Sequence, residues 1–216
     1  MVRKISEIYA EYKIMPNLQM HMYRVAAVAS LIYDNFNEPL NKEEIITACL
    51  LHDMGNIIKS DLSFLPELLK PEGLEYWQKV KDGFIEKYGN DDHEAHVKIL
   101  KELGLSTEII GLVDQVRFSL LCAQRDKADI NIKITHYADG RVDPYGIVSY
   151  EERMEEAKSR YKDRDNLFPL KNREKLIECG KDMERQIFAK CKIRPEDINN
   201  ETVAPIISSL RNFVIK

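Results

Sequence analysis

The sequence is short of cysteine, of net positive charge and of long apolar runs, and each shortage argues against a class of protein. Four cysteines among 216 residues form no C-x-x-C pair, so we expect neither a disulfide scaffold nor a structural zinc site, and a reducing compartment fits the chain. A formal net charge of −4 argues against a nucleic-acid partner, because surfaces that bind nucleic acid are usually basic. No apolar run reaches the length of a membrane span, and residues 1–15 lack the apolar core of a signal peptide. We therefore expect a cytoplasmic protein with no membrane partner.

The residues that are abundant predict an all-α fold. The chain is 44% hydrophobic and 31% charged, which suits a soluble protein with a full core. Its apolar residues recur at helical spacing, and no segment alternates with a convincing period of two. For residues 127–142, which are rich in β-branched side chains, a buried strand is the alternative. We expect helices over residues 3–14, 18–36, 42–53, 75–88, 91–104, 106–122, 127–142, 149–161, 169–191 and 202–216, with one helical turn near 64–70 and N-caps at Asn17, Asn41 and Ser106.

The domain organisation is predicted to be simple. Residues 1–146 should form a helical core, and residues 147–216 should form charged helices that pack on this core as part of the same domain. No linker rich in glycine, serine or proline separates the two parts. A homodimer through the C-terminal helices is compatible with the sequence.

The stretch ACLLHDMGN, residues 48–56, ends an apolar helix in two polar groups, His52 and Asp53. By helical spacing these side chains follow the apolar face of the helix. Burying an unpaired carboxylate is costly, so Asp53 needs a partner. Taken alone, the pair is better explained as a core histidine followed by an aspartate that faces solvent, because a His-Asp dipeptide is common by chance.

Two other helices place polar side chains on faces that should be dry. His21 lies in line with Leu18, Val25 and Ile32, and Asp139 ends the helix predicted over residues 127–142. Imidazole and carboxylate are ligands of borderline and hard divalent metals, and a bound cation would offset the cost of burying the carboxylates. The three helices together therefore indicate a metal site.

The order His21, His52-Asp53, Asp139 resembles the signature of the HD-domain superfamily of metal-dependent phosphohydrolases. The surrounding residues also resemble that family: MHMYRVAAVA around His21, ACLLHDMGN around the pair, and YADGRV around Asp139. The resemblance covers residues 17–145. It implies an all-α HD-domain helical bundle in which His21, His52, Asp53 and Asp139 hold one divalent metal ion, of Mn, Ni, Co, Fe, Zn or Mg.

The resemblance also implies a reaction. A bound metal lowers the pKa of water from about 15.7 towards about 7 and polarises a phosphoryl oxygen. Asp53 would hold this water or accept its proton, in addition to binding the metal. No serine or cysteine nucleophile is then needed.

The chain departs from the family pattern at the candidate phosphate-binding positions. Many relatives read His-Asp-x-Gly-Lys, whereas this chain has Asn56 where the lysine stands. Asn56, Lys59 one turn later, and Arg24 one turn after His21 are therefore the candidate substrate ligands. An arginine that reaches solvent or pairs with a glutamate is an equal alternative for Arg24, and Arg141 has a weaker claim.

A second departure concerns the number of metals. Relatives with two metals use two more histidines between the His-Asp pair and the last aspartate. His93 in HEAHVKILKELG matches the first, and no histidine lies near residue 117 to match the second. We therefore expect one metal, with His93 contacting substrate or protonating the leaving group, and with His96 packed in the fold. His136, one turn before Asp139, is expected to be a hydrogen-bonding neighbour of the site.

The leading hypothesis is a phosphohydrolase for a small phosphorylated substrate, above all a nucleotide or a nucleotide-like compound. The acidic net charge fits a small substrate better than a polynucleotide. Two alternatives stay open: an HD-fold di-iron oxygenase, which would need the missing histidine, and a non-catalytic module that binds metal or nucleotide.

Overall fold

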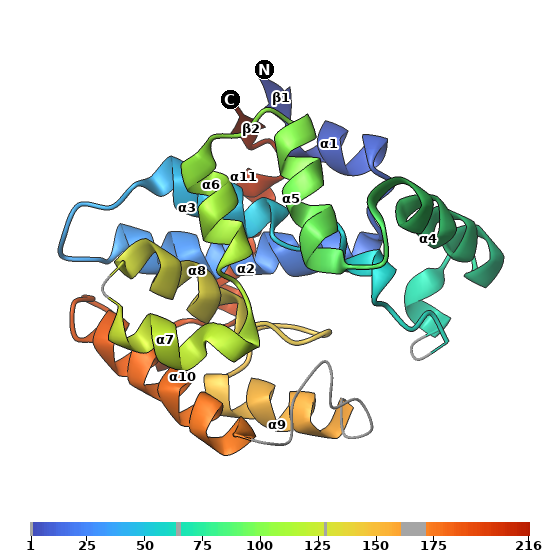
Figure 1. Cartoon of the computed structure of the whole chain (residues 1–216). Helices are drawn as coiled ribbons and strands as arrows, with labels where there is room; N and C mark the ends of the chain where they lie inside the picture. The colour runs from blue at the N-terminus through green and yellow to red at the C-terminus, as the bar shows by residue number, and fades with distance from the viewer. Residues whose placement is uncertain (1, 64–65, 128, 161–171) are drawn as a thin grey trace.

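The computed structural model describes residues 2–63, 66–127, 129–160 and 172–216, and within these ranges it is built almost entirely of helices (Figure 1). This confirms the expected fold class. The α-helices are α1 (Ile5–Glu11), α2 (Pro16–Asp34), α3 (Lys42–Leu51), α4 (Leu74–Tyr88), α5 (Asp92–Glu102), α6 (Thr107–Asp114), α7 (Leu121–Asp126), α8 (Ile130–Asp139), α9 (Tyr150–Arg160), α10 (Arg173–Phe188) and α11 (Asn200–Leu210). The short 3₁₀ helices are η1 (Asn56–Ile58), η2 (Pro66–Leu69), η3 (Phe118–Leu120) and η4 (Pro195–Asp197), and the strands are β1 (Arg3–Lys4) and β2 (Val214–Ile215).

Helix α2 lies at the centre of the fold and packs against α3, α8 and α11. Its middle carries small and β-branched residues, among them Ala26, Ala27 and Val28, which are fully buried and let neighbouring helices approach closely. Helix α3 is buried along most of its length and also packs on α6 and α8. Helices α2, α3 and α8 therefore pack against one another, and polar groups on their facing sides need partners.

Capping explains where most helices begin. The Asn41 side chain accepts a hydrogen bond from the Glu44 backbone at the start of α3, and Ser106 does the same for α6, as expected. The expected cap at Asn17 is wrong, because α2 begins at Pro16. Proline suits the first turn of a helix, where its missing N–H leaves no bond unmade.

The helix expected over residues 106–122 is divided into α6, η3 and α7. Arg117 adopts an extended backbone conformation between them. Its side chain donates to the Asp114 carbonyl at 2.9 Å and pairs with the Asp114 carboxylate, so side-chain bonds replace the helical bond at the end of α6. Within the range 127–142, residues Ile130–Asp139 form α8, which confirms a helix there rather than a strand.

The two ends of the chain form a small antiparallel sheet that the sequence did not indicate. Arg3 pairs with Ile215, so β1 and β2 hold the termini together (Figure 1). Each strand has two residues, which is too short for a period of two to show. The expected helices over 3–14 and 202–216 are therefore shorter than predicted.

The C-terminal helices pack on the rest of the chain. Helix α10 contacts α7 and α8, and α11 contacts α2. The start of α10 expected at Pro169 lies outside the described residues. None of the helices in the described part of the chain is both long and apolar enough to cross a membrane.

A disulfide joins Cys122 on α7 to Cys179 on α10. The sequence, which indicated no disulfide scaffold, did not predict this single bond. The two residues are 57 positions apart, and only the packing of α10 on α7 brings them together, so their spacing in the sequence carried no signal.

Candidate metal centre

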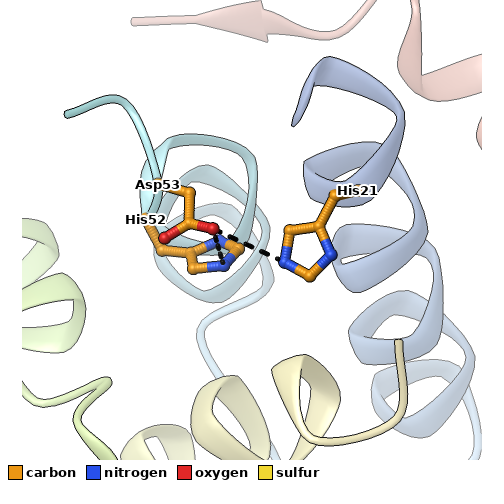
Figure 2. Close-up of side chains that lie close together, drawn as sticks. All are labelled: His21, His52 and Asp53. Atoms are coloured by element: carbon orange, nitrogen blue, oxygen red, sulfur yellow. Dashed lines mark ion pairs between the residues drawn. The ribbon is translucent and has the colours of Figure 1, made fainter. Parts of the chain in front are cut away.

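Three helices bring the four predicted ligands together. His21 lies on α2, His52 and Asp53 follow the last turn of α3, and Asp139 ends α8. Figure 2 shows the Asp53 carboxylate facing the imidazoles of His21 and His52. The ligand atoms of these three residues all lie within 4.8 Å of one another. His21 Nε2 lies 3.6 Å from Asp53 Oδ2 and 3.1 Å from Asp139 Oδ1, and His52 Nε2 lies 3.7 and 3.5 Å from the same two oxygens.

Hydrogen bonds orient two of these side chains. His52 Nδ1 donates to the Cys49 carbonyl at 2.9 Å, which turns His52 Nε2 towards the two carboxylates. That Nε2 is buried and has no hydrogen-bond partner among the described residues. Asn56 Nδ2 donates to Asp53 Oδ2 at 2.6 Å and holds this oxygen between the two imidazoles. A metal ligand is commonly held in place by such a neighbour.

The charges of the four side chains favour a cation between them. Burial lowers the pKa of His52, but the Asp53 and Asp139 carboxylates raise it by more, to about 9. Burial raises the pKa of Asp53, but His52 and Lys59 lower it to about 2. The histidines similarly hold the pKa of Asp139 well below its usual range, against the effect of burial. Both carboxylates are therefore ionised at neutral pH and share a positive partner.

The donor set fits a divalent metal. Each of the two imidazole nitrogens lies 3.1–3.7 Å from the two carboxylate oxygens, and the buried His52 Nε2 has no hydrogen-bond partner among the described residues. Mixed nitrogen and oxygen ligands suit borderline first-row metals such as Mn, Fe, Co, Ni and Zn. His21, His52, Asp53 and Asp139 are therefore the residues that would hold the ion.

Gly55 lets α5 approach the turn that carries His52 and Asp53. A Cβ atom on Gly55 would lie 2.9 Å from Ala95 Cβ, 3.0 Å from the Asp92 carbonyl oxygen and 3.1 Å from His96 Cδ2. These separations are too short for ordinary packing. The glycine is therefore needed for the close contact between this turn and the start of α5.

Helix α5 carries a second group of possible metal ligands. The ligand atoms of Asp92, His93 and His96 lie within 4.8 Å of one another. His96 is buried, its Nε2 has no partner among the described residues, and burial lowers its pKa to about 3. Lys59 Nζ donates to Asp92 Oδ2 at 2.6 Å, so an ion at this second group would compete with an ammonium for Asp92.

The structure gives protein partners to the three candidate substrate ligands. Arg24 is half-buried and donates to the Pro144 carbonyl at 3.3 Å. Asn56 bonds Asp53, and Lys59 bonds Asp92, as described above. These three residues lie beside metal ligands, but their contact with substrate stays a prediction.

Two neighbours of Asp139 have clearer roles. Arg141 is buried and donates to Tyr137 Oη and to the carbonyls of Val148, Pro195 and Ile198. It therefore ties α8 to the C-terminal region, and the suggestion that Arg141 binds phosphate is wrong. His136 Nδ1 lies 2.5 Å from Gln124 Oε1. This hydrogen bond fixes the His136 ring one turn before Asp139.

The contacts that orient the site were not predicted from the sequence. The Cys49 carbonyl, the Asn56 amide and the Gln124 amide were not identified as partners of His52, Asp53 and His136. A signal existed only for Asn56, which lies three residues after Asp53 in a turn and so within reach of its carboxylate.

Comparison with known protein families adds one finding. A family model described as HD domain matches residues 19–140, which is more than half of the chain and includes all four candidate ligands. No curated protein and no solved structure matches the chain.

Proposed function

The chain belongs to the HD-domain family, a superfamily of metal-dependent phosphohydrolases, and on this basis we propose that it hydrolyses a phosphate ester of a small molecule. The observation that carries the proposal is the convergence of His21, His52, Asp53 and Asp139 from three helices on one point. A divalent metal held there would supply a nucleophilic water at neutral pH and would neutralise charge on the phosphoryl group.

Asp53 has a further role beside binding the metal. Its low pKa keeps it ionised at neutral pH, so it can accept a hydrogen bond from the attacking water and hold this water in place. Asn56 positions Asp53 by holding the oxygen Oδ2. This contact gives Asn56 a role in place of the lysine common in relatives.

Arg24, Lys59 and His93 are the groups that we assign to substrate. Arg24 follows His21 by one turn of α2, and Lys59 reaches Asp92 from the end of η1. Both can supply positive charge to phosphate oxygens. Burial lowers the pKa of His93, so its neutral form prevails at pH 7. A neutral imidazole is a weak acid, so we expect His93 to form a hydrogen bond with the ester rather than to act as a general acid.

The small molecule is the open part of the proposal. A nucleotide, which the sequence favours, is one candidate and belongs in any substrate panel. The acidic balance of the chain supports a small ester over a polynucleotide.

A second candidate function has one observation in its favour. Asp92, His93 and His96 form a second group of possible ligands, which would suit an HD-fold di-iron oxygenase. The Lys59 ammonium on Asp92 counts against a second cation. Two irons per chain and oxygen consumption would favour this candidate over the phosphohydrolase.

The test is release of inorganic phosphate by the purified chain of 216 residues. We expect turnover of at least one phosphate monoester with added Mn²⁺, Co²⁺, Ni²⁺ or Mg²⁺. His52→Ala and Asp53→Asn should each abolish it, while circular dichroism shows unchanged helical content. Asp34→Asn is the matched control, because Asp34 is exposed at the end of α2 and pairs with Lys42. Near-normal turnover by either site variant would refute the assignment.

A further inference from the structure

The disulfide between Cys122 and Cys179 joins two helices that both pack on the helix of a candidate metal ligand. Cys122 is half-buried on α7, whereas Cys179 is buried on α10. Helices α7 and α10 contact each other and also contact α8, which ends at Asp139 (Figure 1). A change at the disulfide can therefore reach the metal centre through α8.

Much of the attachment of α7 to α10 depends on the disulfide. Helix α7 has six residues, fewer than an isolated helix needs to be stable in water. In the described part of the chain, the buried residues between the two helices form a small cluster of Leu121, Cys179 and Met183, separate from the main core. Arg125 and Asp182 also pair at 3.1 Å, but ion pairs that water reaches add little to stability. We therefore expect α7 to open locally when the disulfide is reduced.

A hydrogen bond carries the position of α7 to α8. Gln124 on α7 is buried, and its Nε2 donates to a backbone carbonyl just after α6. This leaves Gln124 Oε1 to accept from His136 Nδ1 at 2.5 Å. His136 and Asp139 are three residues apart on α8, so they lie on the same side of this helix. Opening of α7 would remove this partner from the buried His136 ring and free the ring to turn beside Asp139.

We propose that the Cys122–Cys179 disulfide is a redox switch that controls metal binding at the candidate centre through the contact between Gln124 and His136. The oxidised chain holds α7 in place and binds the metal, and the reduced chain binds it more weakly. The inference rests on the proposed function, because it assigns a regulation to the same metal centre. In a compartment that keeps thiols reduced, a disulfide is usually transient and redox-sensing, which is the behaviour that a switch needs.

The reductant for this switch is a dithiol. One of its thiolates attacks the sulfur of Cys122, the more exposed of the two cysteines, and the S–S bond breaks. Cys179 leaves as a thiolate and takes up a proton. The second thiol of the reductant then displaces Cys122 from the mixed disulfide. The reductant becomes a disulfide, and the protein gains two electrons and two protons.

The test measures Mn²⁺ binding by calorimetry on the chain of 216 residues, before and after reduction with dithiothreitol that is then removed under anaerobic conditions. We expect reduction to weaken binding about tenfold, as when a group that orients a metal ligand is lost, and reoxidation to restore it. Cys122→Ser should bind as weakly as the reduced chain. Cys191→Ser is the matched control, because Cys191 is a half-buried cysteine outside the disulfide, and it should respond to reduction as wild type does.

Gln124→Leu tests the route from the disulfide to the centre. It removes the acceptor of His136, so this variant should bind Mn²⁺ weakly in both redox states, with less than about a twofold difference between them. Equal affinities of oxidised and reduced wild type would overturn the proposal. A Gln124→Leu variant that still loses affinity about tenfold on reduction would overturn it as well.

Hydrogen exchange followed by mass spectrometry separates failure of the switch from failure of the metal centre. Amides of α7 and α8 should exchange faster in the reduced chain, with or without Mn²⁺. Unchanged exchange in both helices overturns the proposal. An oxidised chain that binds no Mn²⁺ refutes the metal centre and the proposed function, and with them the control of metal binding, even where α7 opens on reduction.

Discussion

Replacing Gly55 with alanine tests whether the close contact between the His-Asp turn and α5 stabilises the fold. The Gly55 backbone has φ −97° and ψ 2°, which alanine can adopt, so the cost of the change is steric. The added methyl group would meet Ala95 Cβ at 2.9 Å and the Asp92 carbonyl oxygen at 3.0 Å. Extra volume in a packed interior costs about 1–3 kcal/mol, which for a chain of this size lowers Tm by about 2–12 °C.

The assay is thermal unfolding followed by circular dichroism, with a double-mutant cycle. Ala95→Gly removes the nearest atom, so Gly55→Ala and Ala95→Gly should couple by at least about 0.5 kcal/mol in the favourable direction. Gly83→Ala is the matched control, because a Cβ on Gly83, inside α4, would meet no atom within 4 Å. It should raise stability by about 0.5–1 kcal/mol.

A Gly55→Ala variant whose free energy of unfolding lies within about 0.5 kcal/mol of wild type, the range of ordinary surface substitutions, would contradict this close contact. So would substitutions at positions 55 and 95 whose effects add without coupling. Either result would mean that the turn and α5 are not packed as the structure has them.

Three further predictions follow from single contacts. Asn56→Leu removes the hydrogen bond to Asp53, so metal affinity measured by calorimetry should fall about 10–100-fold with the fold intact; unchanged affinity would exclude a positioning role. Lys59→Met removes the charge that opposes the effect of burial on Asp92, so NMR titration should show the pKa of this carboxyl rising; a fall would contradict the ion pair. Reduction of the disulfide between α7 and α10, which spans 57 positions, should cost about 4 kcal/mol in the loop-entropy model, measured by urea unfolding with and without a phosphine reductant; equal midpoints would count against a stabilising crosslink.

The helices were predictable from sequence because their signals are local. The spacing of apolar residues and the caps at Asn41 and Ser106 depend on residues within one or two turns. The break at Arg117 was not predictable in this way, because it depends on a side chain that bonds a carbonyl at a helix end. The pairing of β1 with β2 and the disulfide depend on contacts between distant parts of the chain. The spacing of apolar residues carries no information about such contacts.

For the candidate site, too, some features were predictable from the sequence and others were not. The four candidate ligands, which the structure brings together, were predictable because polar groups on dry helical faces are costly and so stand out in a sequence. The orientation of these side chains was not predicted, because it depends on the Cys49 backbone carbonyl and the Asn56 side-chain amide. Such groups occur throughout any protein, so nothing in the sequence marks these two as partners of the site. Arg141 shows the opposite error. Its position two residues after Asp139 suggested a role in binding phosphate, whereas its hydrogen bonds tie helices together.

Anomalous diffraction from crystals grown with Mn²⁺ tests the account most directly. We predict one strong peak bounded by His21, His52, Asp53 and Asp139, with His52 Nε2 as a ligand, and loss of this peak in His52→Ala. Crystals that diffract well but show no peak there, or a peak only at Asp92, His93 and His96, would contradict the metal centre on which the proposed hydrolysis depends.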